Sequence, residues 1–465
     1  MGEMDDARRT SRKGLPPGPS LPPALQALIW VFRPIRFLND CARRYGDVFT
    51  VRFPFHPPYI FISDPAAIRE IFAGNPRDLL AGEANQVLKP LVGARSVLML
   101  DGERHRRERK LLMPAFHGDR MRAYGDTMRE TADRHIDRWP LGEAFAVQPR
   151  FQRLTLDVIL RTVFGIAEGG RNAMLREQLI RLLDFSINPA LLFTVGRTGE
   201  IFMPRLQRVL GAISPLGRFV KIKERIDRAL YDEFEERSSK GATGREDVLS
   251  MLLEARDERG RAMTYAELRD EMMTLLVAGH ETTATALGWI LYHVLERDGV
   301  RERILDELRS VTGGGPLASD EVSKLEYLDA TIKETMRLNP VLPVTVRLLR
   351  EPSRLGGFEL PAGVVATPNV YSTHRRGDLW PDPERFRPER FLEKPAKPFH
   401  FLPFGGGNRT CLGMAFTYYE MKIVLAQLLR RTRLRVKPGY RARIVRRGIT
   451  FAPSGGMPII VDARN

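Results

Sequence analysis

Residues 404–413, FGGGNRTCLG, constrain this chain more than any other stretch, because they place one cysteine in a loop of almost bare backbone. Three glycines at 405–407 precede Cys411, and glycine has no side chain that would keep a large flat ligand away. The sequence from Leu412 onward has a helical pattern, so Cys411 lies at a positive helix end, where the thiolate is favoured over the thiol. A thiolate in an apolar loop is a good axial ligand for haem iron, and we expect that role for Cys411.

The same segment contains every fixed position of the pattern F-x-x-G-x-R-x-C-x-G, and it therefore resembles the cysteine loop of the cytochrome P450 family. The matching residues are Phe404, Gly407, Arg409, Cys411 and Gly413. The resemblance implies that Cys411 ligates the iron of haem b. It also implies that the haem is contacted by Phe404, Gly405, Arg409 and Gly413. A buried structural cysteine is the alternative interpretation of this segment taken alone.

A long helix is predicted from the capping box of Thr264 and Glu267 to about residue 296. Its middle combines residue types that an apolar helix disfavours. Gly279 costs about 1 kcal/mol relative to alanine, Glu281 places a carboxylate in an apolar wall, and Thr282 can bond back to a backbone carbonyl. Unfavourable choices gathered in one place indicate a functional site.

Residues 278–283, AGHETT, resemble the oxygen-activation motif A-G-x-E-T-T of the same family. The resemblance implies that Thr282 holds a water by a hydrogen bond and that Glu281 relays protons from solvent. It also implies that Ala278 and Gly279 lie against the haem and leave room for oxygen. A polar stripe on a surface helix is the alternative interpretation, since short motifs also match by chance.

Haem carries two propionates, so cations are expected to converge on it. His105 and Arg109 are four residues apart, which places them on one face of a predicted helix. This helix resembles the propionate-binding helix of the family, although many members have tryptophan at the position of His105. The resemblance adds Arg347 and Arg409 as further propionate ligands. For His105 alone, a histidine satisfied on a basic surface is the alternative.

Glu334 and Arg337 are three residues apart in KETMRLNP, so they share a helix face. Together with Arg385 in PERF, they resemble the E-x-x-R and PERF triad of the family. The resemblance implies that the three side chains interlock and fix the loop that leads to Cys411. An ordinary surface pair, worth about 0.5 kcal/mol, is the alternative.

The chain has 465 residues, of which 28% are charged, as is ordinary for a globular protein. We expect a polar and Pro-rich N-terminal tail over residues 1–23 and one catalytic domain over residues 24–465. Strand-like runs occur at 45–53, 57–63 and 356–370 and in the last 35 or so residues, while helical periodicity dominates elsewhere. This predicts a mainly α protein with a smaller β region, in line with the cytochrome P450 fold.

Two cysteines cannot build a disulfide framework, and the polar N-terminus has neither a signal peptide nor a membrane anchor. A cytoplasmic, soluble, bacterial protein is therefore expected. The net charge of +16 comes with basic runs at 104–110 and 430–447. The second run has Tyr440 as its single aromatic residue, too few for stacking bases, so nucleic-acid binding is disfavoured. A solvated charged face and the docking of an acidic redox protein are the two remaining interpretations.

The resemblance implies a monooxygenase that inserts one oxygen atom from O2 into a lipophilic substrate by hydroxylation or epoxidation. No dinucleotide fingerprint occurs, so electrons from NAD(P)H are expected to arrive through a separate acidic ferredoxin or flavodoxin and its reductase. The basic residues proposed to dock this partner are Arg104, Arg106, Arg107 and Lys110.

Apolar segments at 87–100, 185–202, 341–346 and 449–451 are expected to line the substrate pocket. The resemblance weakly favours a fatty acid over a terpenoid, steroid or polyketide. The alternatives in function are a haem-dependent peroxygenase or isomerase, which would be expected to lack the acid–alcohol pair of Glu281 and Thr282, and a haem sensor without turnover.

Overall fold

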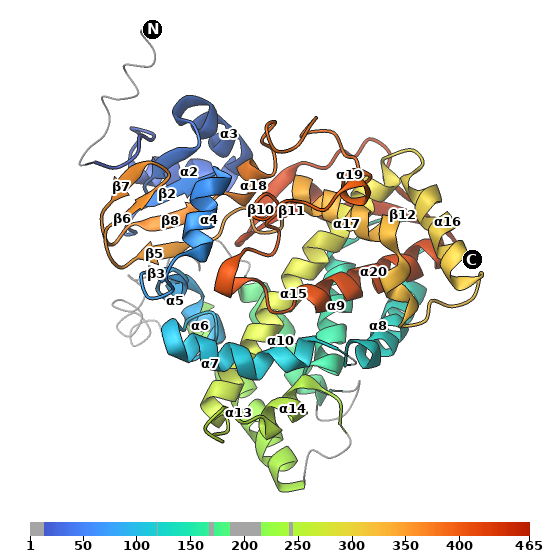
Figure 1. Cartoon of the computed structure of the whole chain (residues 1–465). Coiled ribbons are helices and arrows are strands. Elements are labelled where there is room, and N and C mark those ends of the chain that lie inside the picture. Colours follow the sequence, from blue (N-terminus) through green and yellow to red (C-terminus); the bar gives the residue numbers. More distant parts are fainter. Residues whose placement is uncertain (1–13, 119, 167–171, 187–214, 241–244) are drawn as a thin grey trace.

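The computed structural model describes residues 14–118, 120–166, 172–186, 215–240 and 245–465. Helices make up most of the described chain, and a β-rich part lies on one side of them (Figure 1). The predicted fold class, mainly α with a smaller β region, is confirmed. Among the described residues, no helix is both long and apolar enough to cross a bilayer.

Two short helices begin the described chain, α2 (Pro23–Phe32) and α3 (Pro34–Tyr45), and they are separated where the proline predicts a break. The Pro-rich segment before them packs on the fold, since the carbonyls of Pro16 and Pro17 accept hydrogen bonds from Thr50 at 2.6 and 2.8 Å. Residues 14–23, the part of the expected N-terminal tail that the structure describes, thus pack on the folded protein.

A five-stranded sheet joins the two ends of the chain. It contains β1 (Val48–Val51), β2 (Tyr59–Ile62), β3 (Leu79–Leu80), β5 (Arg347–Leu349) and β8 (Val365–Pro368) in the order β1-β2-β8-β5-β3. The β2–β8 pair is parallel and the others are antiparallel. The adjacent hairpin consists of β6 (Ser353–Leu355) and β7 (Phe358–Leu360). The strands predicted at 45–53, 57–63 and 356–370 are therefore present.

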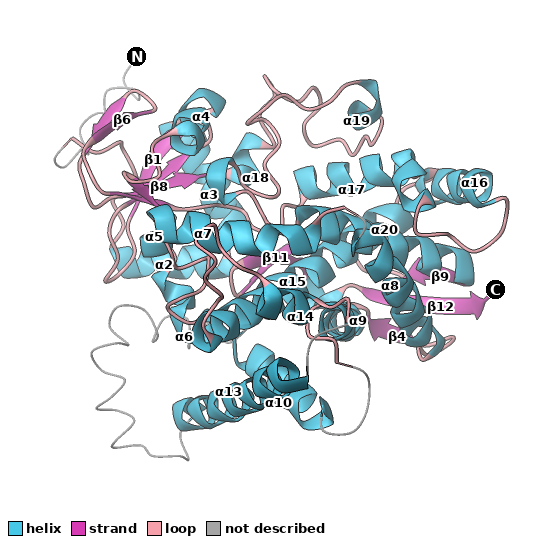
Figure 2. Cartoon of the chain, turned by 60° about the horizontal axis from the view of Figure 1, so that its bottom comes forward, coloured by secondary structure: helices cyan, strands magenta, loops and turns pink. Residues whose placement is uncertain are grey.

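Helix α15 (Tyr265–Leu295) runs through the middle of the protein and positions most of the site (Figure 2). Its capping box is formed as predicted, because the Thr264 hydroxyl and the Glu267 carboxylate each accept from a backbone N–H of the other residue. Helices α9 (Gln148–Thr162), α17 (Glu326–Leu338) and α20 (Met414–Arg431) pack against it. Together they contribute to the largest buried apolar cluster.

The remaining α-helices surround this centre. They are α4 (Pro65–Ala73), α5 (Ala81–Ala84), α6 (Lys89–Val92), α7 (Gly102–Leu112), α8 (Arg120–Asp137), α10 (Asn172–Ser186), α13 (Pro215–Lys240), α14 (Val248–Glu254), α16 (Val300–Thr312), α18 (Val370–Thr373) and α19 (Arg390–Glu393). The 3-10 turns are η1 (Gln86–Leu88), η2 (Met113–Phe116), η4 (Glu321–Lys324), η5 (Gly407–Arg409) and η6 (Ser454–Gly456).

The C-terminal part forms strands, as predicted. A three-stranded antiparallel sheet has the order β4-β12-β9, from β4 (Ala144–Ala146), β12 (Pro458–Arg464) and β9 (Thr432–Val436). A separate hairpin consists of β10 (Ile444–Arg447) and β11 (Thr450–Pro453). This hairpin contacts α2, α3 and α15, so it lies between the N-terminal helices and the central helix.

Candidate active site

The loop that carries Cys411 is held between α4 and the start of α20. Gly405 and Gly407 have φ angles of +70° and +68°, a conformation that residues with side chains rarely adopt. A Cβ atom at Gly407 would lie 2.3 Å from the backbone oxygen of Phe72 in α4, and one at Gly406 would lie 2.5 Å from the Phe72 ring. Two of the three glycines are therefore needed for close packing on α4, a reason that the sequence did not reveal.

Cys411 is accessible to solvent, although protein atoms surround it closely. Its backbone N–H donates a hydrogen bond of 2.9 Å to the carbonyl of Phe404. Burial raises the pKa of the Cys411 thiol, while the backbone N–H of Gly413 and the charge of Arg109 lower it. The N–H of Gly413 thus favours the thiolate, as predicted, but burial has the larger effect in the protein alone. A coordinated metal cation would supply the missing stabilisation of the thiolate.

The predicted cations converge beside this cysteine. Burial, followed by the charges of Arg409, Arg109 and Arg347, lowers the pKa of His105 to about 3. Arg409 forms an ion pair of 2.6 Å with Asp101. Burial, followed by the charge of Arg409, lowers the pKa of Arg347 to about 10. Asp101 thus acts on Arg347 and Arg409 together, with Arg109 close by, and the surplus positive charge suits an anionic ligand.

The middle of α15 presents an uncovered face. Ala278 is exposed and Thr282 is half-buried, whereas most of the neighbouring residues in this helix are buried. The Thr282 hydroxyl donates a hydrogen bond of 2.5 Å to the Ala278 carbonyl one turn earlier. Gly279 lies on another side, where an added Cβ would be 2.9 Å from Ile159 of α9. This glycine therefore allows α9 and α15 to pack closely.

Glu281 has partners that differ from those of Thr282. Its carboxylate accepts a hydrogen bond from the Gln152 side chain of α9 and lies 3.3 Å from the Arg447 guanidinium of β10. The hydroxyl of Thr285 approaches it at 3.5 Å. Burial raises the pKa of Glu281, while Arg447, Gln152 and Thr285 act in the opposite direction. The Glu281 carboxylate thus lies on the side of α15 that faces α9 and β10.

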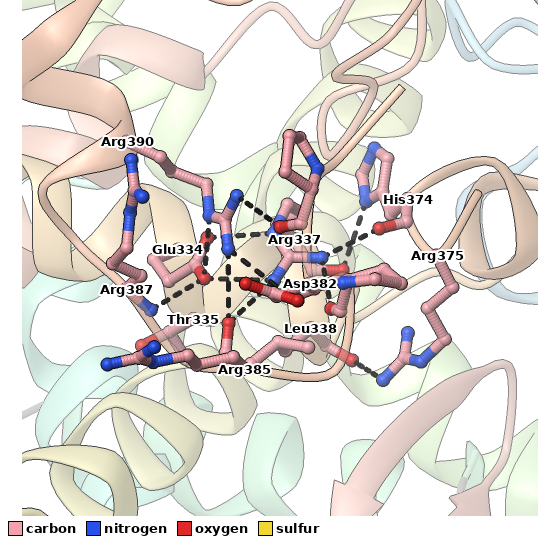
Figure 3. Close-up of polar contacts among 12 residues, drawn as sticks. Glu334, Thr335, Arg337, Leu338, His374, Arg375, Asp382, Arg385, Arg387 and Arg390 are labelled. Carbon is pink, nitrogen blue, oxygen red and sulfur yellow. Dashed lines mark hydrogen bonds and ion pairs between the residues drawn. The ribbon is translucent and has the colours of Figure 1, made fainter. Parts of the chain in front are cut away.

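Glu334 and Arg337 form a fully buried ion pair with hydrogen bonds of 2.7 and 2.9 Å (Figure 3). The third member of this cluster is Arg390, whose Nε donates to the Glu334 carboxylate at 3.1 Å. The backbone N–H of Arg387 donates to the same carboxylate at 2.8 Å. Each buried charge is therefore paired and hydrogen-bonded, as burial requires.

The prediction that the Arg385 side chain completes this triad is wrong. Arg385 is exposed and contributes its backbone carbonyl, which accepts from Arg337 at 3.3 Å and from Arg390 at 3.2 Å. The letters PERF occur twice, at 383–386 and at 388–391, and the buried arginine is the one in the second copy. The repeat was the available signal, but burial of one copy is a tertiary property.

A buried histidine connects this network to the cysteine loop. The Arg337 side chain donates to the carbonyl of His374 at 2.8 Å, and the His374 Nδ1 lies 3.2 Å from the Arg337 carbonyl. The backbone N–H of Leu402 donates to the His374 Nε2 at 2.7 Å. The chain that enters the loop at Phe404 is thus fixed two residues earlier.

A sequence model described as Cytochrome P450 matches residues 16–457 of this chain. The chain belongs to the cytochrome P450 family. A Mycobacterium tuberculosis protein provisionally named cytochrome P450 135B1 is 40% identical over 462 residues, 98% of this chain and 93% of the relative. A second, provisionally named cytochrome P450 135A1, is 37% identical over 450 residues, 96% of this chain and 95% of the relative.

The structure of a retinoic-acid-bound cyanobacterial cytochrome P450, CYP120A1, resembles this P450 with a TM-score of 0.83 at 26% identity. The match covers 97% of this chain and 99% of that one. The chain is therefore a cytochrome P450 monooxygenase, an oxidoreductase of a family that uses haem. The residues of this P450 fit such a group, because the accessible Cys411 lies near Arg109, while Arg347 and Arg409 share one carboxylate, that of Asp101. Haem has an iron that takes a thiolate and two carboxylates that take cations.

The predicted docking surface on α7 is smaller than the sequence suggests. Arg107 forms ion pairs with Asp257, Glu108 and Glu267, so its charge is already neutralised within the protein. These partners lie as far as 160 residues away in sequence, and their proximity could not be read from the chain. Exposed cations on this helix are Arg104, Arg106 and Lys110, of which Arg106 pairs with Glu103 and Lys110 with Glu258.

Proposed function

We propose that this cytochrome P450 inserts one oxygen atom from O2 into a lipophilic carboxylic acid of the fatty-acid type. Electrons from NAD(P)H would arrive through an acidic ferredoxin or flavodoxin and its reductase. The observation that carries the proposal is the placement of the Cys411 thiol beside Arg109, which, with Arg347 and Arg409, lies close to the neutral imidazole of His105. This donor set suits a metal cofactor that carries two carboxylates.

Cys411 would ligate the haem iron, and the haem when bound supplies the oxygen chemistry of the reaction. Arg109, Arg347 and Arg409 would bind the propionates by charge-assisted hydrogen bonds. His105 would add an N–H donor, because its low pKa keeps the imidazole neutral near pH 7.

Ala278 would lie against the haem, together with Phe404, Gly405 and Gly413, whereas Gly279, expected there too, packs against α9. The half-buried Thr282 hydroxyl would hold a water on the uncovered face of α15. It can accept a hydrogen bond from this water while it donates to the Ala278 carbonyl.

Glu281 would pass protons from solvent toward Thr282. The raised pKa of its carboxyl supports this role, since a group that titrates closer to neutral pH both takes up and releases protons. Arg447 and Gln152 hold the carboxylate on the solvent side of the relay. A rotation of the Glu281 side chain would then bring the proton to the Thr282 side.

Two observations support an apolar acid as the substrate. Of the segments expected to line the pocket, residues 87–100 contain the buried Leu91, Val92, Val97 and Met99, and 449–451 contain the buried Phe451. CYP120A1, which resembles this chain in structure, has bound retinoic acid, which is itself an apolar carboxylic acid. Residues 187–202 of the expected lining lie outside the described residues.

The partner proposal rests on charge. The exposed cations on α7 and the net charge of +16 suit an acidic electron donor, and Arg107 is removed from the proposed contact because it is paired internally. Electrostatic complementarity of this kind mainly raises the rate of encounter.

The experiment is an optical titration of the purified ferric protein with fatty acids, terpenoids, steroids and macrolides in turn. A high-spin shift of the Soret band with long-chain fatty acids supports the proposal, and a shift with uncharged terpenoids, steroids or macrolides alone contradicts it. Turnover is then followed with NAD(P)H, ferredoxin and reductase. Product formation that needs only hydrogen peroxide would instead indicate a peroxygenase.

A further inference from the structure

Helix α2 has an apolar face that no other part of the described chain covers. Leu25, Leu28 and Phe32 are spaced by three and four residues, so they share one side of the helix, and all three are exposed. The opposite side is buried through Gln26, Ala27 and Trp30. Residues 21–32 contain no charged residue. A helix that is apolar on its outer as well as its inner side lacks the polar face typical of soluble helices.

Neighbouring elements extend this face. The backbone N–H of Arg52, at the end of β1, donates to the Gln26 side chain at 3.0 Å, which ties the β1–β2 turn to α2. In that turn Phe55 is 81% exposed, and its φ of +62° is uncommon for a bulky residue. Phe32 is 77% exposed. Large aromatic side chains so open to water contribute little to the core.

The β10–β11 hairpin borders α2 on another side. The Arg446 guanidinium lies over the Trp30 ring at 5.3 Å, and the Phe451 ring contacts Trp30 at 6.1 Å between centroids. The hairpin adds the exposed apolar side chain of Val445. We call the set of Leu25, Leu28, Phe32, Phe55 and Val445 the apolar face; α2 lies beside the β-rich side of the molecule (Figure 1).

The charges around the apolar face are mostly positive. Residues 21–56 contain five arginines and two aspartates, and residues 439–453 contain four arginines and no acidic residue. Both aspartates are paired, Asp40 with Arg36 and Arg43 and Asp47 with Arg376. An apolar surface surrounded by cations complements a bilayer that has anionic headgroups and an apolar interior. An acidic protein would complement the arginines but not the uncharged helix face.

We propose that the apolar face is a membrane-docking surface, on which α2, the β1–β2 turn and the β10–β11 hairpin lie in the headgroup region of an anionic bilayer. A ten-residue helix rises about 15 Å, half of a hydrocarbon core, so α2 would lie along the surface and not cross it. The inference is independent of the proposed substrate and haem chemistry, because it concerns side chains away from Cys411.

The experiment measures sedimentation of the haem-loaded protein with vesicles of phosphatidylglycerol and phosphatidylcholine, and with phosphatidylcholine alone. The variant Leu28→Asp/Phe32→Asp/Phe55→Asp should bind the anionic vesicles at least tenfold more weakly than the wild type. Raising the salt concentration should also weaken wild-type binding, since headgroup attraction is screened. The Soret band of each protein reports intact haem, so a folding failure is recognised.

The matched control is Leu141→Asp/Met174→Asp/Leu392→Asp, which changes three exposed apolar residues and the same net charge elsewhere on the surface. It should bind vesicles like the wild type. Equal binding by the two triple variants, or no binding by the wild type, would overturn the proposal. A wild-type dimer in gel filtration that the first variant alone disrupts, without vesicle binding, would assign the apolar face to a second copy and would also overturn it.

Discussion

The backbone N–H of Leu402 donates a hydrogen bond of 2.7 Å to the Nε2 atom of His374, and both residues are fully or almost fully buried. Through this bond the ion pair of Glu334 and Arg337 is connected to the loop that carries Cys411, nine residues farther along the chain. Because Nε2 accepts, the imidazole proton must lie on Nδ1, which faces the Arg337 carbonyl at 3.2 Å. The loop geometry thus depends on a neutral histidine.

This dependence predicts an acid-sensitive protein. Burial, with the charges of Arg337 and Arg375, lowers the pKa of His374 to about 3, whereas histidine in an unfolded chain has a pKa of about 6.5. The unfolded state therefore binds more protons between these pH values, and the free energy of unfolding falls as the pH falls through this window. The measurement is denaturant unfolding at several pH values from 7.5 down to 4.5.

The variant His374→Asn should reduce the pH slope by up to about 1.4 kcal/mol per pH unit, the limit for one proton. His117→Gln serves as the control, because His117 is exposed and should leave the slope unchanged. An unaltered slope in His374→Asn would mean that the acid sensitivity arises from other buried histidines, such as His293.

The hydrogen bonds of Glu334 predict which arginine of the repeated PERF motif is needed for haem loading. Glu334→Ala strands the buried charges of Arg337 and Arg390, and loss of one partner of a buried pair costs about 3–5 kcal/mol. We expect little or no haem-loaded protein from Glu334→Ala and a marked loss from Arg390→Ala. Haem content per protein is read from absorbance. Arg385→Ala is the matched control and should load haem normally, and the opposite order of the two arginine variants would refute the assignment.

The loop glycines predict a packing defect on α4. Gly407→Ala places a Cβ 2.3 Å from the Phe72 carbonyl oxygen in a left-handed backbone conformation, which alone costs about 1–2 kcal/mol. The thermal midpoint should therefore fall, even in protein prepared without haem. Gly377→Ala, where an added Cβ meets nothing within 4 Å, should change stability by no more than about 0.5 kcal/mol. Similar midpoints for the two variants would exclude the packing explanation.

If Glu281 relays protons as proposed, replacing its partner Arg447 should change the pH profile of product formation. The arginine lowers the pKa of Glu281, so Arg447→Ala should raise that pKa and move the pH dependence of coupled product formation upward. The ratio of product to NAD(P)H consumed is measured from pH 6 to 9. Arg441→Ala, an exposed residue near the same hairpin, is the control. A profile that does not move in Arg447→Ala would argue against this relay, and so would a profile that Arg447→Ala still moves when Glu281 is replaced by Gln.

If an acidic electron donor docks on α7, charge reversal of different arginines of this helix should have different effects. Arg104→Glu and Arg106→Glu should raise the apparent KM for ferredoxin and leave turnover at saturating donor unchanged, since they alter encounter. Arg107→Glu should instead lower stability, because Arg107 is bound to three internal carboxylates. Arg228→Glu on α13 carries the same charge change and should leave KM unchanged. Equal KM values for all variants would refute docking at α7.

Local patterns in the sequence predicted much of this fold. Pro34 separates α2 from α3, the capping box of Thr264 and Glu267 begins α15, and the strand-like runs at 45–53 and 57–63 indicated β1 and β2. Each of these features depends on neighbours within a few residues, which a single sequence displays directly. The spacing of Glu334 and Arg337 likewise predicted a shared helix face.

What the sequence could not predict depends on contacts between distant segments. Arg390 and not Arg385 is buried, and Gln152 of α9 holds Glu281 across 129 residues. The pKa of Cys411 depends on both kinds of contact, because the local helix end lowers it, as predicted, but burial by the whole fold raises it more. The local sequence shows which hydrogen-bond donors lie near the Cys411 thiol, whereas the removal of water from this thiol depends on the packing of the whole protein.

The central claim, that Cys411 is the thiolate ligand of a haem, is tested most directly by the optical spectrum of the reduced protein under carbon monoxide. A thiolate opposite the bound gas moves the Soret band to longer wavelength than an imidazole does, because it donates more electron density to the iron. We predict the long-wavelength band for the wild type and its replacement by the imidazole-type band in Cys411→His. A Cys411→His protein that binds haem and keeps the long-wavelength band would contradict the claim.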